Sequence, residues 1–190
     1  MNIGGFLRRN GVAIVLFGGF FVFGGLIISP SLLHARYVAR RSDCQSHVKA
    51  IAMACQQYRA DYDGRYPPLS DGGTRGWSLL IQKGTGPLDF SCREGSESSF
   101  SPTSDYFFNA HLAQRRSYSV KNPELTIAFG EGSDNGPTNS HYWELPNDGS
   151  NPDSVLRRHY NTSNYAFADG HVKMITPEYA RQLWQDAMRN

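Results

Sequence analysis

The chain has 190 residues, a formal net charge of +2 and 39% hydrophobic residues. Setting one long apolar segment aside leaves about 160 residues, which is enough for one globular domain with its own core. The near-neutral charge, and Lys and Arg residues scattered without a basic stripe, argue against nucleic-acid binding.

Residues 11–28 are an uncharged apolar stretch that follows Arg8 and Arg9. A run of this length is at the lower limit for a membrane-spanning helix. We therefore expect a short basic segment, residues 1–10, and a retained anchor over residues 11–30. A cleaved secretory signal is the alternative, but no small-x-small cleavage site follows the run cleanly.

A narrow apolar stripe predicts one amphipathic helix over residues 31–62. Its members recur at alternating spacings of four and three residues: Cys44, Val48, Ile51, Cys55, Tyr58 and Tyr62. Polar side chains occupy the other face: Arg40, Gln45, Lys49, Gln56 and Arg59. The helix should lie with its apolar side on a sheet and end at the Gly64 to Pro68 turn.

The rest of the chain, residues 63–190, predicts a β-rich head. Residues 75–82 suggest a short helix, and residues 103–110 and 124–130 suggest strands. Residues 131–153 are rich in Gly, Asn, Asp and Pro, which indicates a long loop.

A short helix should close the chain and pack back on the head. Thr176 is placed to cap it, and Pro177 suits its first position. The side expected to face the head carries Tyr179, Ala180, Leu183 and Ala187.

Residues 157–175 predict three short strands joined by two tight turns. Asp169-Gly170 interrupts an alternating run and suits a two-residue type I′ turn, which needs positive φ at both positions. Folding there pairs Phe167 with Val172. The pleat then gives one apolar face: Tyr165, Phe167, Val172 and Met174.

Three cysteines permit at most one disulfide within the chain. Cys44 and Cys55 are about 16 Å apart along one predicted helix, which is too far for a bond. An internal disulfide would therefore join Cys92 to one of them. Three buried thiols are the alternative.

No nucleophile elbow and no papain-like cysteine context occurs, so we expect that the protein is not an enzyme. For zinc, the candidate ligands near one another in sequence are His159, Asp169 and His171. The alternative is a core His159 that donates to a backbone carbonyl or to Asp169.

Several motifs follow one another in a specific order over roughly residues 30–175. They are Cys44, Tyr58 and Tyr62, Gly64-Arg65-Tyr66-Pro67-Pro68, Trp77, Phe90-Ser91-Cys92, Tyr106-Phe107-Phe108-Asn109, and His159 with Asp169-Gly170 and His171. This order resembles the bacterial H-x9-DG family of prepilin-type, pilin-like proteins, which are similar to type IV pilins and to type II secretion pseudopilins.

The resemblance implies an α+β, pilin-like fold, in which a long N-terminal helix packs on a small antiparallel sheet and a short C-terminal helix follows. It implies a structural subunit that is anchored in the lipid bilayer, with its head at the cell surface or in the periplasm. An anchored glycan- or protein-binding module that does not polymerise is the alternative.

Assembly in this family uses the apolar N-terminal helix. Partners would be copies of the chain or related pilin-like subunits, brought together by a secretion or pilus machinery. The candidate assembly residues are Val15, Phe17, Phe20, Phe21, Phe23 and Leu26. The chain departs from the family at its start: cutting after Gly5 or after Gly11 puts Asn10 or Leu16 where the family has an acidic fifth residue.

Two site expectations also rest on the resemblance. The family order favours a disulfide between Cys44 and Cys92. Related pseudopilins bind Ca²⁺ through oxygen ligands in a C-terminal loop, and no other cofactor is expected. Here the candidate oxygen ligands are Asp134, Asn135, Asp148, Asn151 and Asp153.

Overall fold

A computed structural model describes residues 34–36, 38–73, 75–92, 103–137, 140–145 and 155–189. The chain divides into two compact units, Met1–Arg40 and Arg41–Asn190. From here on the second unit is called the head, so the head now includes the first helix as well as residues 63–190. The predicted basic segment, the anchor and the candidate assembly residues lie outside the described residues. No helix in the described part combines the length and the apolarity that crossing a membrane requires.

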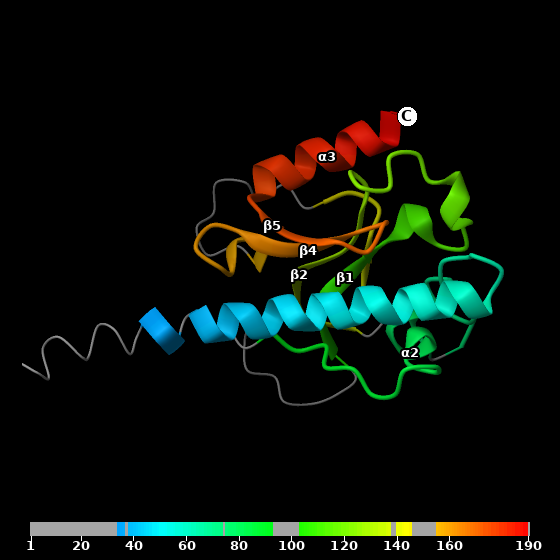
Figure 1. Cartoon of the computed structure of the whole chain (residues 1–190), viewed down its shortest axis with the longest axis horizontal. Coiled ribbons are helices and arrows are strands. Elements are labelled where there is room, and N and C mark those ends of the chain that lie inside the picture. Colours follow the sequence, from blue (N-terminus) through cyan, green and yellow to red (C-terminus); the bar gives the residue numbers. More distant parts are fainter. Residues whose placement is uncertain are drawn as a thin grey trace, which may run out of the picture. The chain divides into compact units, whose positions relative to one another are not determined.

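The head begins with a helix, residues 41–61, drawn in cyan in Figure 1. Residues 34–36 and 38–40 before it are also helical. The predicted stripe is confirmed, because four of its members are buried: Cys44, Val48, Ile51 and Cys55. At the far end Tyr58 is half-buried and Tyr62 is exposed, with its ring stacked on that of Tyr58 at 4.2 Å.

The helix ends where the sequence predicts. Asp63 and Gly64 have φ of 52° and 72°, in the left-handed region that glycine adopts without strain. The Gly64 N–H donates to the Arg59 carbonyl at 2.7 Å, which satisfies one of the last carbonyls of the helix.

Five strands form the sheet, in the order β3-β1-β2-β4-β5. Their bounds are β1 Thr103–Asn109, β2 Ile127–Pro137, β3 His141–Tyr142, β4 Ser163–Phe167 and β5 Val172–Ile175. The expected antiparallel sheet is found except at one edge, where β3 runs parallel to β1. Since β2 is antiparallel to β1 and the chain reverses after β2, β3 has the direction of β1.

The predicted loop over residues 131–153 is wrong in its first part. β2 continues to Pro137, where Thr103 pairs with Pro137. Pairing with β1 gives this polar segment backbone hydrogen-bond partners, so its Gly and Asn content does not prevent a strand.

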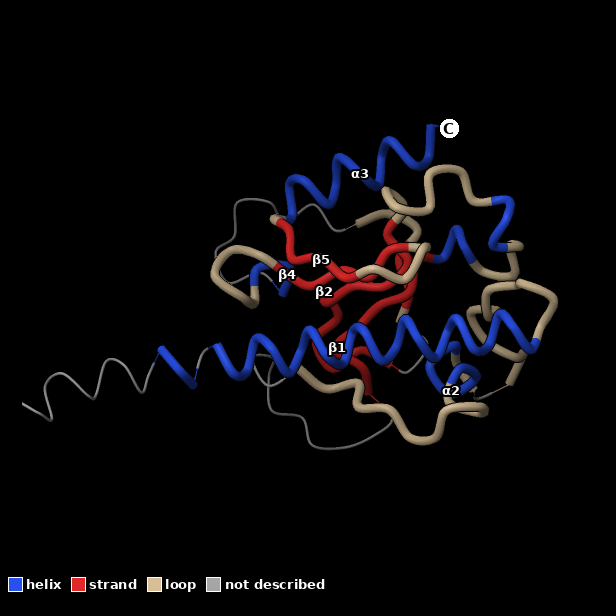
Figure 2. Tube along the Cα trace, viewed as in Figure 1, coloured by secondary structure: helices blue, strands red, loops and turns tan. Residues whose placement is uncertain are grey.

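The sheet separates two apolar layers, and alternate residues of one strand point into different layers. Phe108 packs with the first helix, in a cluster that also contains Trp77 and Phe129. Its neighbour Phe107 belongs to the other cluster, with Trp184 of the C-terminal helix. The helix, the sheet and α3 thus form three layers, which Figures 1 and 2 show.

Both predicted short helices are present, as α2 (Trp77–Ile81) and α3 (Pro177–Arg189). At the start of α3 the Thr176 hydroxyl accepts from the Tyr179 N–H at 3.4 Å. The buried side of α3 comprises Pro177, Ala180, Leu183 and Trp184. The predicted Tyr179 is instead 42% exposed, because it lies beside this face rather than on it. Two 3₁₀ turns, Ala110–Leu112 and Ser117–Ser119, connect β1 to β2.

The β4–β5 hairpin forms at the predicted Asp-Gly dipeptide, but its register differs by one residue. Ala166, rather than Phe167, pairs with Val172. The loop therefore holds three residues, 168–170, and only its last, Gly170, has positive φ, at 98°. A change of register by one residue places the two side chains on opposite faces of the sheet. Val172 therefore packs against the cluster of the first helix, whereas Phe167 belongs to the cluster that contains Trp184.

The first of the three strands predicted in residues 157–175 is absent from the described part of the chain. In its place are a 3₁₀ helix, Val155–Arg157, and a tight turn that leads into β4. Tyr160 and Asn161 have φ of 47° and 66°, and the His159 and Thr162 backbones exchange hydrogen bonds of 2.9 and 3.1 Å across them. This type I′ geometry fixes where His159 enters the core.

Candidate functional site

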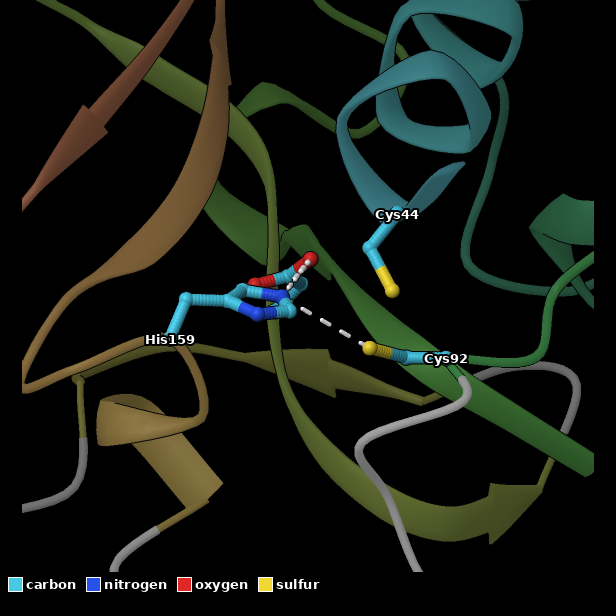
Figure 3. A group of neighbouring side chains, drawn as sticks. Cys44, Cys92 and His159 are labelled. Atoms are coloured by element: carbon cyan, nitrogen blue, oxygen red, sulfur yellow. Dashed lines mark hydrogen bonds and ion pairs between the residues drawn. The ribbon is translucent and has the colours of Figure 1, made fainter. Parts of the chain in front are cut away.

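Four potential metal ligands from distant parts of the sequence meet between the first helix and the sheet. Cys44 lies on the helix, Cys92 precedes β1, Glu131 lies on β2 and His159 stands at the turn before β4. Their ligand atoms all lie within 4.8 Å of one another, and all four residues are buried. In Figure 3 the Cys92 thiol is directed toward the His159 ring, and the Cys44 thiol lies close to the Cys92 thiol. These four residues are called the four-ligand cluster below.

The backbone at Cys92 is held by a buried acidic side chain. The Cys92 N–H donates to Asp105 Oδ2 at 2.7 Å. Asp105 is also 3.8 Å from Arg158 Nη2, in an ion pair of which both side chains are almost fully buried. The next residue after Arg158 is His159, so one ion pair positions two members of the cluster.

Glu131 is fully buried and is surrounded by donors. Its Oε2 accepts from the Asn164 N–H at 2.9 Å, and its Oε1 accepts from Asn164 Nδ2 at 3.0 Å. Oε1 is also 3.2 Å from His159 Nε2. A buried carboxylate is stable only with such partners, so the Glu131 position is specified by Asn164 and His159 together.

The His159 ring faces the cluster through Nε2, which is 3.2 Å from Glu131 and 3.8 Å from Cys92 Sγ. Nδ1 has no hydrogen-bond partner among the described atoms. Burial lowers the pKa of His159, but hydrogen bonds to Cys92 and Glu131 and the Glu131 charge outweigh this and raise the pKa to about 9. Without a metal ion, His159 and Glu131 form a buried ion pair.

All three cysteines lie in the described part of the chain, and none is in a disulfide there. A hydrogen bond with Cys44 and burial raise the pKa of the Cys92 thiol far above its ordinary value. The cluster nevertheless brings Cys44 and Cys92 together, so the disulfide expected between them stays a prediction. Cys55 is not part of the cluster; burial raises the pKa of its thiol to about 12.

The residues of the H-x9-DG spacing are divided between two places. His159 lies in the four-ligand cluster, while Asp169 and Gly170 form the hairpin loop. His171 is exposed and its Nδ1 is 2.7 Å from Asp169 Oδ1. The structure therefore does not bring His159 together with Asp169 and His171, as the zinc interpretation requires.

The hairpin loop contacts the far end of the first helix. Gln56 Nε2 donates to the Asp169 carbonyl at 3.1 Å, and Arg59 Nη1 donates to the Ala168 carbonyl at 3.1 Å and to the Tyr66 hydroxyl at 2.7 Å. Gln56 and Arg59, expected on the face away from the sheet, instead join the helix to the sheet. We call this contact the hairpin junction.

Glu131 is the member of the cluster that sequence reasoning missed. It is the first residue of the segment predicted as a loop, and no short ligand spacing connects it to Cys44, Cys92 or His159. The calcium site stays a prediction. The side chains of Asp134 and Asn135, and residues Asp148, Asn151 and Asp153, lie outside what the structure describes.

Comparison with known protein families gives a match to part of the chain. A family model described as a protein of unknown function, DUF1559 (SBP_bac_10), matches residues 33–81. This family is associated with pilin-like proteins. The match spans the first helix, its terminating turn and α2. No curated protein and no solved structure matches the chain.

Proposed function

We propose that the chain is a non-enzymatic, pilin-like structural subunit whose apolar N-terminal segment anchors it in a bilayer and joins it to other subunits. The observation that carries this proposal is the first helix, whose buried stripe rests on the sheet and which follows the helical residues 34–36 and 38–40. The family match at residues 33–81 supports the same reading.

The physical requirement on such a subunit is a front segment that is stable both in lipid and against other helices. Residues 11–28 carry no charge, and burial of such a segment stabilises either state at about 25 cal/mol per Å² of apolar surface. The head must also stay folded when the N-terminal segment moves from the bilayer to other subunits and force acts on the first helix. The cluster and the hairpin junction, at the two ends of the helix, meet that need.

An assembly test compares two aspartate substitutions in the native host. Phe20→Asp places a charge in the apolar segment, which should remove the chain from sheared surface filaments because a charge is costly in lipid and in a helix bundle. Tyr118→Asp, at a head position that is 76% exposed, is the matched control and should leave the filament fraction unchanged.

A wild-type chain that is absent from sheared filaments, and monomeric after detergent extraction, would contradict assembly. N-terminal sequencing of the native protein adds an independent result. No acidic fifth residue follows Gly5 or Gly11, so the sequence leaves prepilin-type cleavage open, and an intact Met1 would exclude it.

A second candidate function is a permanently anchored binding module. One observation favours it: a hollow of about 810 Å³ between α3 and the end of β3 is lined by Trp143, Arg181 and Trp184, among others. Trp143 is 55% exposed, and such an aromatic surface suits a glycan or protein ligand. Trp143→Ala should then abolish adhesion to that ligand without changing the amount of the chain in the membrane fraction.

A further inference from the structure

We propose that Cys44, Cys92, Glu131 and His159 bind one zinc ion that joins the first helix to the sheet. Two thiolates, one imidazole and one carboxylate are a ligand set that Zn²⁺ accepts, with four ligands in a closed site. The residues come from the helix, from the segment before β1, from β2 and from the turn before β4. This inference does not depend on whether the subunits form filaments.

Two of the distances between ligand atoms fit tetrahedral coordination, and all four ligand atoms lie within 4.8 Å of one another. Ligands about 2.0–2.3 Å from a zinc ion lie about 3.3–3.8 Å from one another along the edges of a tetrahedron. The measured His159 Nε2 to Glu131 Oε1 distance is 3.2 Å, and Cys92 Sγ to His159 Nε2 is 3.8 Å. Only small side-chain movements would therefore place all four atoms around one ion.

The contacts around the cluster orient the ligands as outer partners do in metal sites. Asn164 donates to both oxygens of Glu131, and Asp105 accepts from the backbone of Cys92. The turn at Tyr160 and Asn161 holds the backbone of His159. These partners exist without any ion, so the site is largely formed before the metal binds.

Binding replaces protons by the metal. Both thiols lose their protons, and the proton between His159 Nε2 and Glu131 Oε1 also leaves, so that His159 becomes a neutral ligand. A zinc ion with two thiolates and one carboxylate has a net charge of −1. All four residues are at most 3% exposed, and a ligand set this enclosed indicates a structural role and not catalysis.

A disulfide between Cys44 and Cys92 competes with zinc for the same two sulfur atoms. A disulfide uses neither Glu131 nor His159, which would remain as a buried pair beside it. The convergence of all four ligand atoms within 4.8 Å of one another favours the metal. The two states exclude each other, which makes the proposal simple to test.

The experiment uses the full chain, purified in detergent, reduced and freed of metal with a chelator. Zn²⁺ is titrated against a chromophoric competitor, and Co²⁺ is added as a spectroscopic probe. We expect one zinc ion per chain and, with Co²⁺, the thiolate-to-metal charge-transfer band and the strong visible bands of a tetrahedral site.

Variants then identify the ligands. Cys92→Ala and His159→Ala should weaken Zn²⁺ binding by more than about 100-fold, since even outer partners of metal ligands contribute 10–100-fold. Asn164→Ala should weaken it by about 10–100-fold. Cys55→Ala is the matched control, because Cys55 is a buried thiol on the same helix as Cys44 but lies outside the cluster. The Zn²⁺ affinity of this variant should equal that of the wild type.

The wild-type cobalt spectrum keeps the test valid if a variant folds poorly. The proposal is overturned if the reduced wild type gives no thiolate-to-cobalt band. It is equally overturned if Cys92→Ala and His159→Ala bind zinc as the wild type does. A third contrary result is a Cys44–Cys92 disulfide, found by mass spectrometry, in a protein that binds no metal after reduction.

Discussion

The two junctions that hold the first helix on the sheet use different chemistry. At the Cys44 end is the four-ligand cluster, whose polar groups have no access to water and bind only one another and their buried neighbours. Glu131 and His159 are both fully buried there. At the other end, Gln56 and Arg59 are exposed or half-buried and bind backbone carbonyls of the hairpin loop.

This difference decides what each junction contributes. A group removed from the buried cluster leaves a charge or a donor that water cannot reach, and the free-energy cost is large. At the hairpin junction water replaces most of a lost hydrogen bond, so the cost is modest. Substitutions should therefore rank by access to water rather than by the number of hydrogen bonds.

The largest effect should follow Glu131→Ala. In chelator, this change leaves the charged His159 ring and the Asn164 N–H without their buried partner, and we expect the free energy of unfolding to fall by about 3–5 kcal/mol. Urea denaturation measures it. Glu124→Ala, at an exposed acid, should change stability by less than about 0.5 kcal/mol. Equal values for the two variants would show that the cluster does not hold the helix.

Gly170→Ala should come next. Gly170 has φ of 98°, and a Cβ there would collide with the Gln56 side chain. Gly72, with φ of 83° and open space around it, is the control that measures backbone strain alone, about 1–2 kcal/mol. We expect the loss at Gly170 to exceed that at Gly72 by about 0.5 kcal/mol, because the exposed Gln56 side chain must move aside and lose its hydrogen bond. In a Gln56→Ala background the excess should vanish, and its persistence would mean that the hairpin does not contact Gln56.

Arg59→Ala should destabilise the head by about 1–2 kcal/mol, because it removes charged donors from the Ala168 carbonyl and the Tyr66 hydroxyl. These two acceptors retain a bond to each other, since the Tyr66 hydroxyl donates to the Ala168 carbonyl at 3.1 Å. Lys49→Ala, on the exposed side of the same helix, is the control. Thermal unfolding of the two variants at matched pH would separate them, and indistinguishable midpoints would contradict the junction.

The smallest effect should follow Gln56→Ala, at about 0.5 kcal/mol, since one exposed hydrogen bond is lost. Hydrogen exchange sharpens this comparison. Amides of the hairpin loop should exchange faster in this variant, while amides near His159 should be unaffected because the two junctions lie at opposite ends of the helix. Faster exchange at both places would show that the junctions act as one unit.

Local features of the sequence predicted many elements of the fold correctly. The stripe from Cys44 to Cys55 placed the first helix and its buried face, and Thr176-Pro177 placed the start of α3. Asp169-Gly170 placed the last hairpin, but its register could not be read from the dipeptide, because both two-residue and three-residue loops accommodate it. The parallel β3 edge also has no local signal, since strand direction follows from the path of the chain.

The sequence by itself therefore determined the helices and turns that have a periodic apolar pattern or a capping motif. Residues close to one another in the chain are enough to specify these elements. Only the tertiary structure decided which buried polar groups meet. No ligand motif of regular sequence spacing connects Cys44, Cys92, Glu131 and His159. They converge because the helix, the sheet and one turn pack around a single point. The tertiary packing also makes Glu131, and not Asp169, the partner of His159. Asp169 lies in the hairpin loop, which contacts the other end of the helix.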